Sequence, residues 1–396
     1  MITAVIEGQR LKVYEVDPSA DPRWEAFVRS HRDGSIYHHP AWISVLQEEY
    51  GQKAGHLICE DTCGEIQAVL PLFYTRGVPF LSGQLLIAPR LSSLPRTPLG
   101  GPLSKSADAT ITILKAAIDR TTSDPKRYLQ IKTQGPELDG LIDGIVAVPW
   151  RLSYILRLPD RSAGPFRIQN SHNRGNVRWA VQKAVNHGVT VKAADTEAEL
   201  GEWYLLYQQT MRRNAVPARS YQFFLSMWCE LNQRNLMRLL LAVRTEGSCS
   251  RPLAGAIFLT LGRTISYAFN GSDERGLALG ANDLIQWSAI NQAHDEGFEL
   301  FDFGEVPDGK PGLAKFKSKW GSDPIRLYRY YYPGAAGLQA QANGWGARVV
   351  SIGKLIWRYV PLPATAWLSN RIYEKLSISV SLLSLCDRAA DVLLFF

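Results

Sequence analysis

A glycine-bearing segment that leads into a helix is the first pattern in this sequence suited to binding a ligand. The segment RGLALGA covers residues 275–281, between a strand predicted over 263–270 and a helix predicted over 282–296. The first residues of that helix, 281–284, have backbone N–H groups without carbonyl partners at the positive end of the helix dipole. This arrangement predicts a phosphate site of the type that a nucleotide-containing donor needs. The alternative is a simple connecting loop, because glycine-rich loops are common.

The sequence lacks the other common catalytic and metal-binding patterns. His38 and His39 are adjacent, so their side chains point apart on a strand. Cys59 and Cys63 are spaced loosely like half of a metal site, but no second cysteine or histidine pair completes it. The five scattered cysteines argue against a disulfide framework and for a reducing compartment. We therefore expect no serine-hydrolase, kinase or zinc site and no bound metal.

The elements that precede residue 156 predict a first domain, 1–155. Residues 10–16 alternate as a strand does, and Asp21 is a suitable cap for a helix that begins at Pro22. Further helices are expected over 40–49 and 107–121, and further strands over 56–61, 65–74 and 127–133.

Residues 156–333 predict a second domain with a more regular order of elements. Helices are expected over 171–187, 196–213, 219–233, 282–296 and 312–319, and strands over 189–194, 236–244, 252–261, 263–270, 298–306 and 324–332. Both domains run from helices through antiparallel strands to a helix and another strand, which favours a duplication. Residues 334–396 predict a linker followed by a C-terminal helical tail.

The run FDFGEVPDGKPGLAKFKSKWG, residues 301–321, resembles the signature of FemAB-like proteins. Its recurring features are Asp302-Phe303-Gly304, Gly312-Leu313, Phe316-Lys317 and Trp320-Gly321, and the segments 171–191 and 267–276 are similar to the family as well. FemAB-like proteins are transferases with two GNAT-type acyltransferase domains, and related acetyltransferases of exopolysaccharide loci share the motif. The resemblance implies an α+β fold with two tandem GNAT-like domains, each a mixed, mostly antiparallel sheet flanked by helices.

The resemblance also implies a groove where the strands 263–270 and 298–304 splay apart. Phe316 and Lys317 would lie beside this groove, where a lysine can neutralise a phosphate or a developing oxyanion. The alternative for Lys317 is a solvated charge among its lysine neighbours. Asp302, at a strand end facing the groove, would accept a proton from the attacking ammonium, or else cap the following loop.

Donor contacts follow from the pyrophosphate loop of GNAT proteins, which has Arg or Gln, two residues, Gly, one residue, and Gly or Ala. Arg275 and Gly280 fit this pattern, whereas Ala278 stands where the family has Gly. The donor implied is acyl-CoA, such as acetyl-CoA. Its expected contacts are Arg275, Gly280, Ala281, Asn282, Tyr267 and Asn270.

Acceptor contacts are expected at Asn173, Arg174 and Arg213. The alternative for each of them is that it belongs to a solvated basic face and binds no acceptor. The peptidoglycan-building FemAB members grip a UDP-sugar peptide with basic residues. No lysine follows Trp42 closely here, and this departure argues against that acceptor. The coiled-coil arm of some tRNA-dependent members is also missing, since no heptad pattern is sustained. A tRNA donor is therefore disfavoured but stays open.

The net charge is +7, from 44 Lys and Arg against 37 Asp and Glu. This excess favours anionic partners such as a nucleotide, a phospholipid surface or a tRNA, and no basic run indicates a DNA-binding arm. No signal peptide is evident, and charges interrupt the most apolar stretch, 376–394, so we expect a cytoplasmic protein. Tryptophans and basic residues in the tail suit peripheral contact with the inner membrane; the alternative is that the tail packs on the domains.

These features predict an enzyme that moves an acyl group from acyl-CoA to an amine of a cell-envelope or exopolysaccharide precursor. The acceptor would be a small-molecule or lipid-linked sugar or peptide. Two alternatives stay open. One is a FemAB-type transferase of peptidoglycan peptides that depends on aminoacyl-tRNA. The other is a non-catalytic GNAT-like scaffold at the inner membrane surface.

Overall fold

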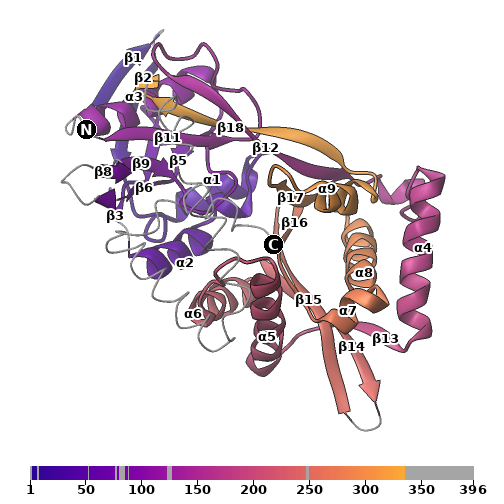
Figure 1. Cartoon of the computed structure of the whole chain (residues 1–396). Coiled ribbons are helices and arrows are strands. Elements are labelled where there is room, and N and C mark those ends of the chain that lie inside the picture. Colours follow the sequence, from indigo (N-terminus) through magenta and orange to yellow (C-terminus); the bar gives the residue numbers. More distant parts are fainter. Residues whose placement is uncertain are drawn as a thin grey trace. The chain divides into compact units, whose positions relative to one another are not determined.

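The computed structural model describes residues 2–6, 9–51, 53–75, 78–79, 85–87, 89–122, 127–246 and 249–334. The chain divides into two compact units, coloured along the sequence in Figure 1. Among the described residues, the first unit holds those up to Trp150 and those from Arg326 onward. The second unit runs from Arg151 to Ile325. The tail expected over 334–396 lies outside the described residues, apart from Gly334.

A five-stranded antiparallel sheet forms one layer of the first unit. Its order is β1 (Ile2–Ile6), β2 (Gln9–Glu15), β4 (Leu57–Glu60), β5 (Ile66–Leu70) and β10 (Leu103–Ser104). Helix α3 (Ala107–Thr122) covers it, because Ile113 and Leu114 share one buried cluster with Val13 and Leu57. Apolar side chains that recur at helical spacing thus account for this packing.

The first unit contains a second set of paired strands. Their order is β18 (Asp323–Tyr332), β11 (Tyr128–Thr133), β9 (Arg90–Ser93), β6 (Leu72–Thr75) and β3 (Lys53–Ala54). The pairing is antiparallel except between β11 and β9. The remaining elements are α1 (Pro22–Ser30), η1 (Ile36–His38), α2 (Pro40–Tyr50), and the paired β7 (Val78–Pro79) and β8 (Leu85–Ile87).

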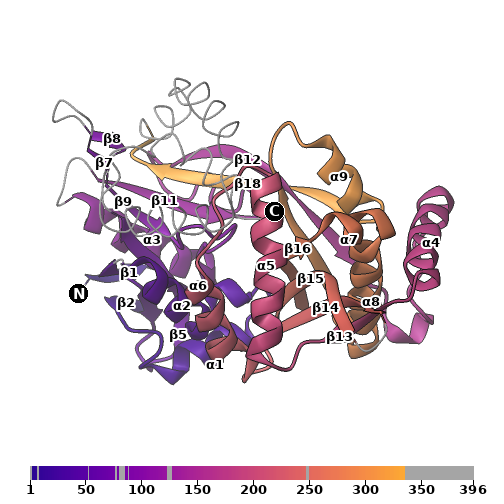
Figure 2. The ribbon, with the colours of Figure 1, turned by 60° about the horizontal axis from the view of Figure 1, so that its bottom comes forward.

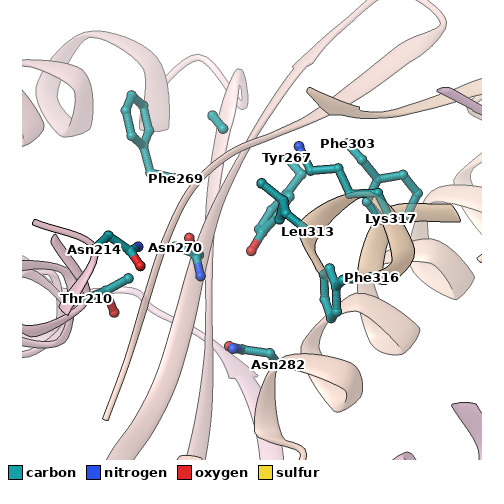
Figure 3. A pocket seen from close by; sticks show the side chains of 11 residues that line it. Thr210, Asn214, Tyr267, Phe269, Asn270, Asn282, Phe303, Leu313, Phe316 and Lys317 are labelled. Atoms are coloured by element: carbon teal, nitrogen blue, oxygen red, sulfur yellow. The ribbon is translucent and has the colours of Figure 1, made fainter. Parts of the chain in front are cut away.

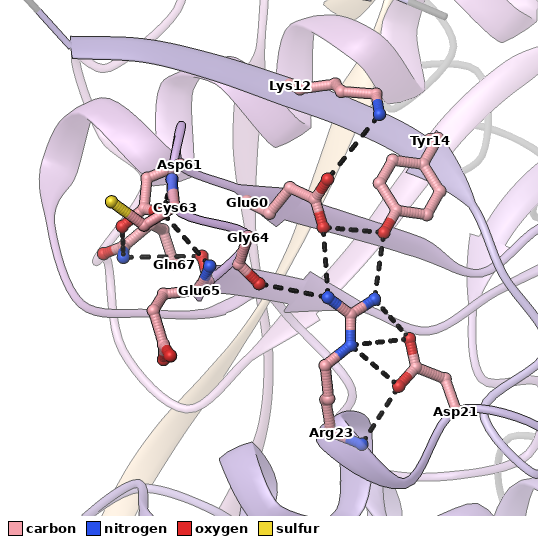
Figure 4. Close-up of polar contacts among 10 residues, drawn as sticks. All are labelled: Lys12, Tyr14, Asp21, Arg23, Glu60, Asp61, Cys63, Gly64, Glu65 and Gln67. Atoms are coloured by element: carbon pink, nitrogen blue, oxygen red, sulfur yellow. Dashed lines mark hydrogen bonds and ion pairs between the residues drawn. The ribbon is translucent and has the colours of Figure 1, made fainter.

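Arg23 fastens the start of α1 to the five-stranded sheet, as Figure 4 shows. Its guanidinium donates to Asp21 at 2.7 Å, to Glu60 at 3.3 Å and to the Gly64 carbonyl oxygen at 3.0 Å. Asp21 also accepts from the Arg23 N–H at 3.0 Å, which confirms the expected helix cap. In the nearby turn the Cys63 N–H donates to the Asp61 carboxylate at 2.9 Å, so Cys63 is an ordinary turn residue.

The second unit is built on a six-stranded sheet. Its order is β13 (Val189–Ala193), β14 (Met237–Glu246), β15 (Cys249–Leu261), β16 (Thr264–Ser272), β17 (Leu300–Val306) and β12 (Val146–Arg157). Neighbouring strands are antiparallel except for β16 and β17, which run parallel.

Helices flank this sheet on both faces. They are α4 (Ser171–Asn186), α5 (Glu197–Arg213), α6 (Tyr221–Met227), α7 (Glu274–Leu279), α8 (Ala281–Glu296) and α9 (Pro311–Ser318), with short turns η2 (Arg161–Ala163) and η3 (Trp228–Asn232). Trp203 of α5 donates to the Gly255 carbonyl oxygen, whereas Ala254 and Ala256, one step along the strand, pack with α8. Alternate residues of β15 therefore face different helices. Figure 2 shows the ribbons of α5 and α8 on either side of the strands.

The mixed sheets with flanking helices confirm the expected α+β class, but two local predictions were wrong. His38 and His39, expected on a strand, instead end the short turn η1 and cap the start of α2. Residues 274–279, expected as part of a loop, form the short helix α7. Asp273 caps it by accepting from the Gly276 N–H at 2.6 Å, and Gly280, at φ +78°, ends it. Gly276 serves close packing, because a Cβ there would lie 2.3 Å from the Leu253 carbonyl oxygen.

Candidate active site

Strands β16 and β17 diverge part-way along their length. They pair from Thr264↔Leu300 to Ser266↔Asp302 and no further. Beyond that point β17 continues beside β12, for example at Ser153↔Glu305. One edge of β16 from Tyr267 onward therefore has no strand partner among the described residues. This divergence is the splay that the sequence led us to expect.

A β-bulge lies at the same place on the other edge of β16. Ile257 pairs with Phe269 and Phe258 pairs with Tyr267, so Ala268 is the extra residue between them. A bulge interrupts the ladder of hydrogen bonds and turns a peptide group away from it. The bulge thus releases a peptide group where the strands part.

A cavity of about 160 Å³ occupies this divergence. In Figure 3 the polar ends of Tyr267, Asn270 and Asn282 point toward the same space. Phe303 of β17 and the first two turns of α9 close its other side. The full lining is Thr210, Asn214, Tyr267, Ala268, Phe269, Asn270, Asn282, Phe303, Leu313, Phe316 and Lys317.

The segment from α4 to α9 matches a known family. Residues 171–318 match the family model described as an acetyltransferase (GNAT) domain. Residues 171–318 form a GNAT acyltransferase domain. The match includes both diverging strands and every residue that lines the cavity.

Solved structures share the fold over most of the chain. The crystal structure of FemX is 16% identical, with a TM-score of 0.63, and the match covers 80% of this chain and 96% of FemX. L-PGS from Bacillus licheniformis is 14% identical, with a TM-score of 0.54, over 87% of this chain and 97% of L-PGS. At these identities the likeness is one of fold. No match was found among curated protein sequences.

Lys317 of the GNAT domain is buried, with 2% of its surface exposed. Its Nζ donates to the carbonyl oxygens of Gly304 at 3.0 Å and Glu305 at 2.9 Å. Burial lowers the pKa of Lys317 to about 7, against the opposing effect of the Asp302 and Glu305 carboxylates. The solvated charge considered from the sequence is therefore excluded. The lysine fastens α9 to β17 beneath the cavity.

Asp302 does not lie where the sequence led us to expect it. It occupies the middle of β17 rather than the strand's end, and it is not part of the cavity lining. Its Oδ1 accepts from the Ser153 hydroxyl at 3.1 Å and from the Gly304 N–H at 2.7 Å. Burial raises the pKa of this carboxyl. Because Asp302 is buried beside Lys317, its direct effect is on the lysine.

The start of α8 adjoins the cavity through Asn282. Gly280 precedes this helix and no side chain caps it, so its first N–H groups have no carbonyl within the helix to pair with. Asp283 of the first turn is paired with Lys319. Gly280 has a packing reason of its own, because a Cβ there would lie 2.9 Å from the Ala180 carbonyl oxygen.

A second, more open hollow of about 330 Å³ brings Arg213 and Arg275 together. Arg213 is fixed by hydrogen bonds from Nη2 to the Ser272 carbonyl oxygen at 2.6 Å and to Thr210 Oγ1 at 3.0 Å. Burial lowers its pKa. Thr210 lines the cavity, so Arg213 of the second hollow is hydrogen-bonded to a residue of the cavity wall. The hollow is lined by Gln209, Arg212, Arg213, Asp273, Glu274 and Arg275.

The GNAT domain thus gathers only part of the predicted site. Tyr267, Asn270, Asn282, Phe316 and Lys317 meet at the cavity, and Arg213 and Arg275 meet at the second hollow. Gly280 and Ala281 adjoin the cavity without lining it, and Asn173 and Arg174 of α4 line neither hollow.

Sequence reasoning missed the cavity residues Thr210, Asn214, Ala268 and Phe269. Thr210 and Asn214 are four residues apart at the end of α5, a spacing that places both on one helix face. That spacing was the available signal. No group of His, Cys, Asp or Glu suited to a metal occurs among the described residues, and no helix there is long and apolar enough to cross a bilayer.

Proposed function

We propose that the GNAT domain transfers an acyl group from acyl-CoA to a primary amine of a cell-envelope or exopolysaccharide precursor. The observation that carries this proposal is the divergence of β16 and β17 at a cavity whose wall contains the Ala268 bulge. A free strand edge, a peptide group outside the ladder and a small pocket are what a thioester needs.

The free edge of β16 suits the donor's pantetheine arm. That arm contains two amide groups, which can pair with the peptide groups of residues 267–270 as another strand would. The cavity, at about 160 Å³, is smaller than a whole-ligand site and fits the acyl and thioester end only. The diphosphate would then lie outside, at the uncapped start of α8.

The chemistry requires a neutral amine, a held carbonyl and a place for one proton. The amine attacks the thioester carbon, a C–N bond forms, and the C–S bond breaks to release the thiolate. Peptide N–H groups at the Ala268 bulge stabilise the oxyanion. Burial raises the pKa of Tyr267, so its hydroxyl stays protonated and can donate to the departing sulfur.

Lys317 is our candidate for the group that takes the proton from the attacking amine. A neutral lysine has two N–H donors, which match the two carbonyl oxygens of Gly304 and Glu305. Its lone pair is then free to accept. A pKa of about 7 keeps a large neutral fraction near neutral pH. Asp302 would act through Lys317 rather than on the substrate.

The acceptor would carry an anionic group beside its amine. Arg213 and Arg275 line the hollow on the other side of Thr210, so an anion held there would leave the rest of the acceptor close to the cavity. A phosphate on a lipid-linked or nucleotide-linked sugar has this character. The name of one fold relative, a putative lysylphosphatidylglycerol synthetase, also points to a lipid product.

A second candidate is transfer from an aminoacyl ester on tRNA. The fold likeness to FemX favours it, because the FemAB-like proteins that the sequence resembles include tRNA-dependent members. The acyl-CoA proposal predicts heat on titration of the full chain with acetyl-CoA or longer acyl-CoAs, and thiol release when amines are added. Absence of both, together with transfer from charged tRNA, would support the second candidate instead.

A further inference from the structure

The positive charge of this protein is concentrated in one stretch of the second unit. Residues 157–187 contain six Lys and Arg and a single acidic residue, so they account for five of the seven net charges. The cations are Arg157, Arg161, Arg167, Arg174, Arg178 and Lys183. Among the described residues none of the six takes part in an ion pair. Arg161 and Arg174 donate to backbone carbonyl oxygens, which leaves their charge without a counter-ion.

Helix α4 forms the centre of this stretch and is mostly open to solvent. Figures 1 and 2 both show it on the outer side of α8. Only Val177 and Ala184 of its sixteen residues are buried. The helix contains no Asp or Glu, and at 1.5 Å per residue it is about 24 Å long, with Arg174, Arg178 and Lys183 distributed along it.

Two large apolar side chains are exposed on the same helix. Trp179 is 67% exposed and Val185 is 49% exposed. The Lys183 ammonium lies 5.2 Å from the centre of the Trp179 ring. Neither packing nor the proposed acyl transfer accounts for these side chains, and exposed apolar groups among cations suit a surface that is both anionic and apolar.

We infer that α4 and the loop before it dock on an anionic phospholipid surface. The cations would meet lipid phosphates, and Trp179 would enter the headgroup layer, which accepts an apolar ring with a polar edge. An RNA partner would match the charge but not the apolar groups. One tryptophan is also a poor base-stacking platform. The inference does not depend on the proposed donor or acceptor.

The test measures binding of the full chain to vesicles by sedimentation. We expect binding to vesicles of phosphatidylglycerol and phosphatidylcholine in equal parts, weakened by salt, and none to phosphatidylcholine alone. The double change Arg167→Glu and Arg178→Glu should weaken binding by at least about tenfold, since each basic residue contributes about fivefold. The matched control, Arg234→Glu with Arg251→Glu, changes charge elsewhere on the same unit and should bind as the wild type does.

A second pair of variants tests the apolar part of the contact. Trp179→Ala should weaken vesicle binding several-fold, while Leu205→Ala, at a side chain 59% exposed on α5, should not. Thermal melting establishes that all variants are folded. Wild-type protein that ignores anionic vesicles would overturn the inference. So would a double variant that binds them normally, or variants that lose affinity for a tRNA mixture but not for vesicles.

Discussion

The side-chain nitrogen of Lys317 lies 3.0 Å from the carbonyl oxygen of Gly304, just after the last pairing between β17 and β16. Gly304 has φ +73°, a conformation that glycine adopts without strain. The lysine therefore holds α9 against β17 at the place where the strands part. One buried side chain both forms part of the cavity wall and carries a nitrogen of lowered pKa.

The pH dependence of transfer should follow the neutral fraction of Lys317. At saturating acyl-CoA, kcat should rise with pH through a midpoint near 7, because the amine accepts a proton only when neutral. Lys317→Met should lower kcat by about 10²-fold or more and abolish this limb. Lys315→Met, at an exposed lysine on the same helix, should leave the profile unchanged.

The opposite slope would point to the role first expected for this lysine. If kcat fell as pH rose through 7, the charged form would be required, as for neutralising an oxyanion or a phosphate. Lys317→Arg separates the two cases further, since arginine stays charged throughout and cannot act as a base.

Stability should depend on pH through the same group. The pKa of Lys317 is lowered from its ordinary 10.5 to about 7 on folding, so between these values the unfolded chain binds a proton that the folded chain does not. The free energy of unfolding should therefore rise with pH across this window, by up to about 1.4 kcal/mol per unit. Below pH 7 the cost of the buried charge is fully present.

Urea unfolding at pH 7 and pH 9 compares the wild type with Lys317→Met. The wild type should gain stability relative to the variant as pH rises, because methionine does not titrate. An equal change in both proteins would mean that the lysine is not desolvated as its burial indicates.

Local patterns were sufficient to predict most helices and strands. Asp21 caps α1 as expected, and apolar spacing located α3, α5 and α8. The sequence failed at α7, where two glycines suggested a loop. Whether Gly276 breaks a helix depends on its fit against Leu253 from a distant strand, which no local pattern records.

The sequence predicted the place of Lys317 in the candidate site but not the place of Asp302. The motif at 301–321 placed Lys317 by resemblance, and the lysine lines the cavity. The position of Asp302 was predicted wrongly because the direction of its side chain depends on the register of β17 with β12. The Ser153 hydroxyl of β12 donates to its carboxylate. The Ala268 bulge depends likewise on pairing with β15, so no spacing within β16 could reveal it.

Gly280 should prove necessary for packing whatever the donor is. In Gly280→Ala the new side chain is strained by the positive φ of 78°, and its Cβ would lie 2.9 Å from the Ala180 carbonyl oxygen. In Gly188→Ala the φ of +73° causes the same backbone strain, but no atom lies within 4 Å of the added Cβ. The control should lose about 1 kcal/mol and Gly280→Ala clearly more, measured by urea unfolding. Equal losses would contradict tight packing of the α8 start on α4.

Asp302 should tune Lys317 rather than react. Its carboxylate raises the pKa of the lysine, so Asp302→Asn should move the rising limb of kcat to lower pH with little change in KM. The asparagine oxygen can still accept from the Gly304 N–H, which preserves the turn. Ser153→Ala keeps the carboxylate and serves as the control. A kcat lost at every pH in Asp302→Asn would instead fit a direct role in proton transfer.

Arg275 should act on the acceptor and not on the acyl donor. Its side chain lines the second hollow and makes no ion pair among the described residues, so Arg275→Ala removes a free cation with little structural cost. We expect KM for a phosphorylated amine to rise about tenfold and KM for an uncharged amine to stay constant. Arg251→Ala, an exposed arginine on β15, is the matched control. The pyrophosphate contact expected from the sequence predicts a different result, a weaker affinity for acyl-CoA with every acceptor. Titration of acyl-CoA into the variant therefore decides which anion Arg275 binds.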